Sequence, residues 1–177
     1  MSKQGWTGRL RLHQFWWVLL AVVAGTLIMT QHSGQEMRRA FSVFGQPGYV
    51  VPRQEVPALR QNAPYLHVFS RLGGLPLQEA LTHPMGLNGG SSFIEILYGS
   101  PSGNYLDLVQ SSYALRTSSP ATRQTIGTLE VREGVATLGG RRRRFAYGRL
   151  GPGYFMLVGP VKGSSFAPAL REIAAQR

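Results

Sequence analysis

The stretch that decides the fold is IGTLEVREGVATLGGRRRRFAYGRL, residues 126–150. It contains two runs with alternating apolar and polar residues, separated by Gly139 and Gly140. Favoured two-residue hairpin turns need positive φ angles, which glycine adopts at little cost. In that register Leu138 lies opposite Arg141, and the pairing continues outward residue by residue. The sequence therefore predicts a long antiparallel hairpin with the two glycines at its tip.

The two faces of this hairpin differ in what they carry away from the turn. One face presents a row of apolar residues that can join a core: Leu129, Val131, Val135, Ala146 and Leu150. Near the turn, arginines alternate onto both faces, so we expect residues 141–144 to project beyond the core as a solvated tip. Arg144 is diagonal to Glu133, and Arg149 faces Glu130, which provides both arginines with local partners. Within the hairpin no such partner is expected for Arg141, Arg142 and Arg143.

Further strand-like runs lie on both sides of the hairpin. Residues 92–99 and 105–113 alternate between apolar and polar side chains, and the glycine-containing segment between them is typical of a hairpin loop. The run YFMLVGPV at 154–161 is apolar on both faces, which favours a central strand. Glu95 and Asp107 occupy polar positions of their runs, so we expect both side chains on a solvated face.

The remaining segments predict shorter elements. Residues 64–72 read as a strand, residues 76–84 as a short helical turn between two prolines, and residues 116–125 as a polar loop. Residues 164–177 predict a helix whose buried stripe contains Leu170, Ile173 and Ala174. Together these patterns predict an α+β domain: an antiparallel β-meander sheet of about five strands with a C-terminal helix packed on one face.

The N-terminal region contains the uncharged run FWWVLLAVVAGTLIM, residues 15–29. Lys3, Arg9 and Arg11 precede it without an acidic residue, so the positive-inside rule places the N-terminus in the cytoplasm. We predict an N-terminal transmembrane helix whose anchoring side chains are Phe15, Trp16, Trp17, Leu19, Leu20, Val22, Val23, Leu27 and Ile28. A cleavable signal peptide is the alternative, and it also leaves the following residues outside the cytoplasm. A buried helix of a soluble protein is a third interpretation.

Four segments follow from these patterns. Residues 1–14 form a basic cytoplasmic tail, and residues 15–33 form the membrane anchor or signal peptide. Residues 34–64 contain four prolines and no sustained periodicity, which indicates a tether with an irregular strand near residues 49–51. Residues 65–177 form the extracytoplasmic α+β domain.

The charge of the chain favours anionic partners. Lys and Arg number 19 against 8 Asp and Glu, which gives a formal net charge of +11. Such a surface attracts acidic proteins, anionic lipids, acidic envelope polymers or nucleic acid. An outer location and the lack of an aromatic-studded basic sheet argue against nucleic acid. We expect the contact site at Arg141, Arg142, Arg143, Arg144, Phe145 and Tyr147, and the alternative is a hairpin whose charges serve only solubility.

No motif predicts a reaction. The chain has no cysteine, which excludes disulfides and thiolate chemistry. None of the histidines has a second ligand at metal-binding spacing: His13, His32, His67 and His83. Asp107 is the one aspartate, no serine lies in a nucleophile motif, and the glycine-rich runs match no phosphate-binding loop. We therefore expect no catalytic residue, no cofactor and no metal ion.

The hairpins resemble a known family. The runs FIEILYGSPSGNYLDLVQSSY (93–113) and GTLEVREGVATLGGRRRRFAYGRLGPGYFMLVGP (127–160), with a short helix after them, are similar to an extracytoplasmic domain of unknown function. That domain is attached to bacterial single-span proteins, including anti-sigma-factor-like regulators. About 14 residues precede the membrane segment here, too few for a folded sigma-factor-binding domain. The resemblance therefore implies the outer module alone.

The functional expectation combines these points. We expect a non-enzymatic, single-pass membrane protein whose outer domain binds a protein partner or an anionic envelope component, as a sensor, scaffold or accessory subunit. One alternative is a secreted or periplasmic carrier that holds an apolar ligand after signal cleavage. A further alternative is an envelope enzyme of unknown reaction.

Overall fold

The computed structural model describes residues 39–83, 93–100 and 103–176, and this part of the chain is mostly β. Ten antiparallel strands form one sheet in the order β1-β2-β4-β5-β6-β10-β9-β8-β7, and β3 pairs with β4 outside this order. The strands are β1 (Arg39–Phe41), β2 (Pro47–Pro52), β3 (Arg71–Leu72), β4 (Leu75–Thr82), β5 (Phe93–Gly99), β6 (Tyr105–Ser111), β7 (Ala121–Ile126), β8 (Leu129–Leu138), β9 (Arg141–Leu150) and β10 (Gly153–Pro160).

The predicted central hairpin is confirmed. β8 and β9 pair with Leu138 opposite Arg141, and the register continues without a shift to Val131 opposite Gly148. Gly139 and Gly140 form the turn with φ angles of 54° and 74°. The β5–β6 hairpin and the inner position of β10 also agree with the sequence.

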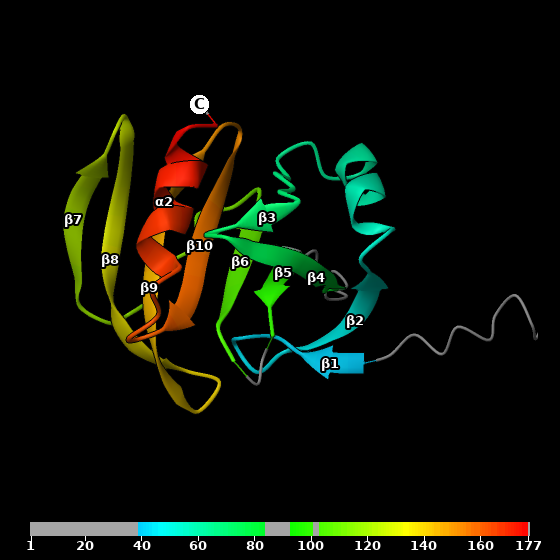
Figure 1. Ribbon diagram of the computed structural model, residues 1–177, viewed down its shortest axis with the longest axis horizontal. Helices are drawn as coiled ribbons and strands as arrows, with labels where there is room; N and C mark the ends of the chain where they lie inside the picture. The colour runs from blue at the N-terminus through cyan, green and yellow to red at the C-terminus, as the bar shows by residue number, and fades with distance from the viewer. Residues whose placement is uncertain (1–38, 84–92, 101–102, 177) are drawn as a thin grey trace, which may run out of the picture. The chain divides into compact units, whose positions relative to one another are not determined.

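One face of the sheet, which we call the helix face, packs against two helical elements. These are α2 (Phe166–Ala174) and the 3-10 helix η1 (Val56–Gln61). Figure 1 shows α2 lying in front of the strands β9 and β10. The buried residues of α2 confirm the predicted amphipathic helix, although its stripe consists of Phe166, Ala169, Leu170 and Ile173. They share a core with alternate residues of the strands, such as Ile96, Leu108, Leu129 and Leu157.

The opposite face, which we call the turn face, carries a second and smaller core. Its buried members are Val43, Val109, Ala136, Phe145, Met156 and Val158. Val43 belongs to the turn between β1 and β2, and Leu115, which packs on the same cluster, belongs to the segment that connects β6 to β7. This connection leads from the middle of the sheet to its far edge, because β10, β9 and β8 lie between β6 and β7.

The structure corrects the number of strands and several local predictions. Residues 121–126 form β7 rather than a polar loop; the strand lacks apolar alternation because it is an exposed edge. Residues 75–82 form β4 rather than a helical turn. A register shift between Leu77 and Glu79 puts Leu77 and Ala80 into the same core, a three-residue spacing that imitates a helix.

The described part of the predicted tether contributes β1 and β2 to the sheet and η1 to the helix face, so the irregular-tether prediction is wrong there. β2 confirms the strand expected near residues 49–51, with Pro47 and Pro52 at its two ends, where a missing amide hydrogen is tolerated. Val56 and Ala63 are buried in the helix-face core. The segment 64–72, predicted as a strand, contains only the two-residue β3.

The predicted tail and membrane anchor, together with residues 34–38, lie outside the described residues. Within the part of the chain that the structure describes, no helix has the length and hydrophobicity needed to cross a bilayer.

Candidate functional site

The arginine run of β9 is divided between the two faces of the sheet and between two environments. Arg141 and Arg142, next to the turn, are exposed. Arg143 and Arg144 are partly buried, so the prediction of a fully solvated tip is wrong for half of the run. The reason is that each of these two side chains meets groups from elements outside the hairpin.

Arg144 is held on the helix face. Its guanidinium forms an ion pair with Glu133, which confirms the predicted diagonal contact. It also lies 4.6 Å from the centre of the Phe166 ring, a cation–π contact with α2. Arg144 therefore has a local structural role.

Arg143 is held on the turn face. Its Nη1 atom donates to Oδ2 of Asp107 at 3.0 Å, and the two side chains are 14% and 6% exposed. Asp107 comes from β6, which is separated from β9 by β10. The guanidinium also lies 5.2 Å from the centre of the Tyr105 ring. The sequence prediction considered partners within the hairpin alone, and it missed this one because the contact depends on strand order.

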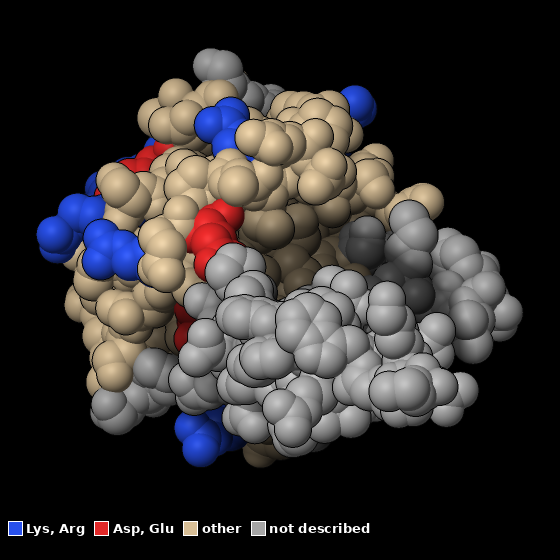
Figure 2. Space-filling model, turned by 90° about the vertical axis from the view of Figure 1, so that its right-hand side faces the viewer, with Lys and Arg blue, Asp and Glu red and all other residues tan. Residues whose placement is uncertain are grey.

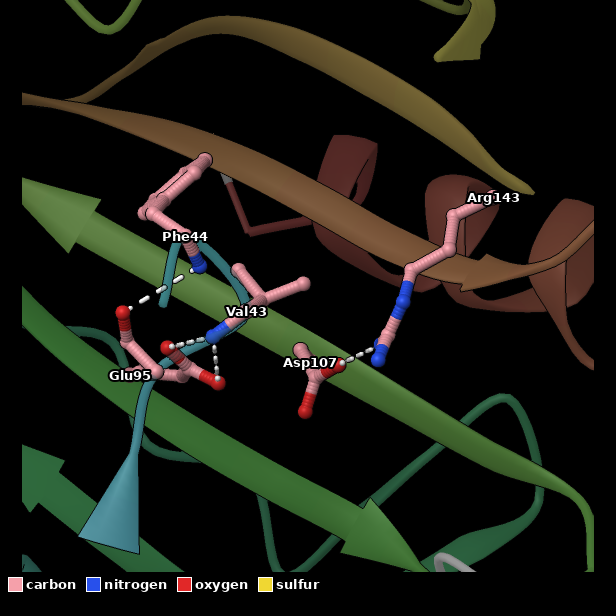
Figure 3. A network of polar contacts seen from close by, with 6 residues as sticks. Val43, Phe44, Glu95, Asp107 and Arg143 are labelled. Carbon is pink, nitrogen blue, oxygen red and sulfur yellow. Dashed lines mark hydrogen bonds and ion pairs between the residues drawn. The ribbon is translucent and has the colours of Figure 1, made fainter. Parts of the chain in front are cut away.

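Glu95 is the third member of this buried network (Figure 3). Its two carboxylate oxygens accept hydrogen bonds from the backbone N–H of Val43, at 3.1 and 3.0 Å. Glu95 and Asp107 are 4% and 5% exposed, so the expectation of a solvated face is wrong for both. The β1–β2 turn and Arg143 supply the polar partners that burial requires.

The electrostatics of the network favour a bound proton. The network contains two buried carboxylates and one guanidinium, which pairs with Asp107, so full ionisation would leave an uncompensated negative charge. Burial, with the nearby Asp107 charge as a smaller cause, raises the pKa of Glu95 to about 8. Burial raises the pKa of Asp107 to about 7, although Arg143 opposes that shift. We infer that the pair retains a proton at neutral pH.

A small pocket of about 200 Å³ adjoins the buried network. Its lining includes Glu79, Tyr105, Arg141, and the three network residues Glu95, Asp107 and Arg143. Each carboxylate of the network already has a partner inside the protein. The polar contacts of the network are therefore made within the protein. They hold the β1–β2 turn against Glu95 of β5 and hold β9 against Asp107 of β6.

A larger groove of about 570 Å³ lies on the turn face near β7. Residues 114–117, from the β6–β7 connection, form one part of its lining, and strands β7 to β10 contribute the rest. We call it the basic groove, because its charged residues are Arg116, Arg123, Arg132, Arg149 and a single acid, Glu130. Tyr147 and Tyr154 add aromatic surface.

The charges within the basic groove are unbalanced. Arg123 and Arg132 lie directly opposite each other on β7 and β8, an arrangement that destabilises a sheet. Glu130 compensates one of them, through an ion pair of 2.6 Å with Arg123. Among the described residues, Arg116 and Arg132 have neither an ion pair nor a side-chain hydrogen bond. An anion in the groove would offset this excess of positive charge.

The predicted contact residues are therefore dispersed. Phe145 is wrong as a contact residue, because its side chain is completely buried in the turn-face core. Tyr147 is half-buried, stacks 6.0 Å from Phe145 and lines the basic groove. Arg141 lies at the pocket beside the network, at the opposite end of β9 from Arg149.

Sequence reasoning missed most of the basic groove. It assigned Arg116 and Arg123 to a loop, and it gave no role to Arg132 or Tyr154. The usable signal was the pair Arg123 and Arg132, which face each other across a hairpin once residues 121–126 are recognised as a strand.

The histidines and carboxylates of the described residues form no metal site. His83 is buried, stacks on Phe93 at 4.1 Å and shares a hydrogen bond with the carbonyl oxygen of Pro47. Burial lowers the pKa of His83 and of His67. His13 and His32 lie outside the described residues. Within the described ranges, no three histidine or carboxylate side chains are arranged to hold a metal ion.

Comparisons with known proteins identify no relative. No family model, no curated protein and no solved structure matches the chain.

Proposed function

We propose that this chain is a non-enzymatic, membrane-anchored binding protein whose β-domain lies outside the cytoplasm and holds an anionic partner in the basic groove. The anchor is the apolar run at residues 15–29, and the orientation follows from the basic residues before it. The domain then acts as a sensor, a scaffold or an accessory subunit of an envelope complex.

The unbalanced charge of the groove carries this proposal. A protein gains no stability from opposed arginines such as Arg123 and Arg132, so their juxtaposition needs another explanation. Binding an anion supplies one, because a carboxylate or phosphate between two guanidinium groups accepts charge-assisted hydrogen bonds from both. The tyrosines in the lining add apolar contact area with a polar tip.

The distribution of basic side chains over the surface also favours the basic groove as the binding site. Figure 2 shows the side near β2, where the described surface is mostly uncharged and basic side chains are scattered around its margin. The groove, by contrast, gathers four arginines around one hollow: Arg116, Arg123, Arg132 and Arg149.

Anion binding is better supported than the two alternatives, an envelope enzyme and a carrier of apolar ligands. Against an enzyme, the buried acids with raised pKa values, Glu95 and Asp107, are engaged within the fold: Val43 N–H donates to both oxygens of Glu95, and Arg143 donates to Oδ2 of Asp107. A carrier of apolar ligands needs an apolar cavity, whereas charged residues line both pockets described above.

The test compares two double variants of the full chain, purified in mild detergent. Arg116→Ser with Arg132→Ser removes charge from the groove, and Arg141→Ser with Arg142→Ser removes the same charge from the hairpin tip. We expect salt-sensitive binding to poly-L-glutamate to fall by at least tenfold in the groove variant and much less in the tip variant. Equal binding by both variants and the unchanged protein would contradict the proposal.

A second measurement tests the anchor. An intact mass that includes residue 1, together with retention in the membrane fraction, is expected. A mature N-terminus after the apolar run, with release into the periplasm or medium, would show a cleaved signal peptide instead.

A further inference from the structure

β7 ends the sheet, with no described strand on its outer side (Figure 1). Its register with β8 runs without interruption from Ala121 to Ile126. The strand itself contains no proline and no bulge, two devices that commonly protect an edge from pairing with another chain. Its one charged residue, Arg123, repels a basic strand but attracts an acidic one. Its four central residues, 122–125, are exposed. This edge is therefore open to a further strand.

The open edge and the basic groove are adjacent. Arg123 belongs to β7 and lines the groove, and Arg132 stands opposite it on β8. Arg116, on the segment that leads into β7, lines the same groove. A strand added beside β7 would lie about 4.8 Å from it, with every second side chain on the groove side. These side chains would come within reach of Arg123.

We propose that β7 accepts an extended acidic peptide as an additional strand, with alternate carboxylates of the peptide directed toward Arg123 and Arg132. This inference rests on the proposed anion-binding function and names the class of partner. Backbone hydrogen bonds to the edge would provide affinity that does not depend on sequence, and the groove arginines would select for acid at every second position.

The charges favour a foreign peptide over a second copy of this chain. Two copies paired at β7 would bring their Arg123 side chains to the same seam, and each chain has a formal net charge of +11. Like charges opposed across a strand pair are destabilising. An acidic partner reverses the sign of this interaction.

The experiment uses two synthetic peptides and the full chain in detergent. Both peptides alternate glutamate with threonine over eight residues, and one of them is N-methylated at every second residue. N-methylation removes the backbone donors on one edge and preserves the charge. We expect the unmethylated peptide to bind at least tenfold more tightly, and to slow hydrogen exchange at alternate amides of residues 121–126.

The variants separate charge from strand addition. Arg132→Ser is expected to weaken the unmethylated peptide by about tenfold, and Arg142→Ser, a tip arginine, by less than twofold. Equal binding of both peptides, still weakened by Arg132→Ser, would overturn strand addition and leave anion binding in place. No binding of either peptide or of poly-L-glutamate would overturn both. Protection of β7 that rises with protein concentration alone would assign the edge to self-association.

Discussion

Arg143 and Arg132 lie on the same face of one sheet and have opposite environments. Arg143 is mostly buried, with 14% of its side chain exposed, and is paired with Asp107 at 3.0 Å. Arg132 is exposed, and Arg123 stands directly opposite it. The first arginine compensates a buried acid, while the second contributes to an excess of positive charge. Residue type and alternation are the same in both regions, so the contacts supplied by neighbouring strands decide which arginine stabilises the fold and which is free to bind.

The largest expected effect comes from removing the buried cation. Arg143→Met leaves Asp107 and Glu95 buried without a positive partner, and breaking a buried pair in this way costs about 3–5 kcal/mol. Denaturant unfolding of the full chain should therefore show a large loss in the free energy of unfolding. Arg132→Met is the matched control, for which we expect a change within about 0.5 kcal/mol. Equal losses in the two variants would remove the distinction between the regions.

A double substitution sharpens the same point. Replacing Arg143 by Met and Asp107 by Leu removes the guanidinium and its paired carboxylate together. Most of the lost stability should return, because apolar residues of similar volume often replace a buried ion pair without loss. Failure of this rescue would indicate that the Tyr105 contact, rather than the ion pair, dominates.

The buried pair also predicts how stability depends on pH. The pKa values of Glu95 and Asp107 rise from 4.5 and 3.8 to about 8 and about 7 in the folded state. Between about pH 4 and 8 the folded state keeps protons that the unfolded state releases, so stability is highest at acidic pH and falls as pH rises. Denaturant midpoints measured across this range should decline. Glu95→Gln should flatten the decline, and an unchanged slope in that variant would exclude Glu95 as its source.

A smaller effect is expected on the helix face. Arg144→Met removes the ion pair with Glu133 and the cation–π contact with Phe166, and keeps an apolar stem of similar length. Because these side chains are partly exposed, we expect a loss of about 1 kcal/mol in the free energy of unfolding. A loss as large as that of Arg143→Met would show that the difference in exposure between Arg144 and Arg143 does not determine how much each contributes to stability.

The smallest effect on stability should accompany a clear effect on binding. Glu130→Gln removes the acid that compensates Arg123, which makes the basic groove more positive. We expect tighter binding of poly-L-glutamate and an almost unchanged melting temperature, because exposed ion pairs contribute little to stability. Glu55→Gln, which removes an exposed acid outside the groove lining, is the charge-matched control. Equal gains in affinity would point to net charge rather than to the groove.

The sequence predicted the parts of the fold that depend on local pattern. Gly139 and Gly140 set the turn, and from that turn the register of β8 and β9 follows by counting. The apolar run of β10 and the amphipathic pattern of α2 were equally readable. Local pattern failed for β7, which is polar because it is an edge, and for β4, where a register shift imitates helical spacing.

The candidate site was much less accessible to sequence reasoning. The sequence by itself determined the excess of arginine, the hairpin that carries part of it and the faces on which alternate arginines lie, because these depend on composition and on a two-residue period. Strand order decided the rest. It brought Asp107 to Arg143, although β10 separates their strands, whereas Arg123 and Arg132 meet in the local β7–β8 hairpin. Burial and electrostatic energies depend on such distances in space, so only the tertiary structure could separate the structural arginines from those of the groove.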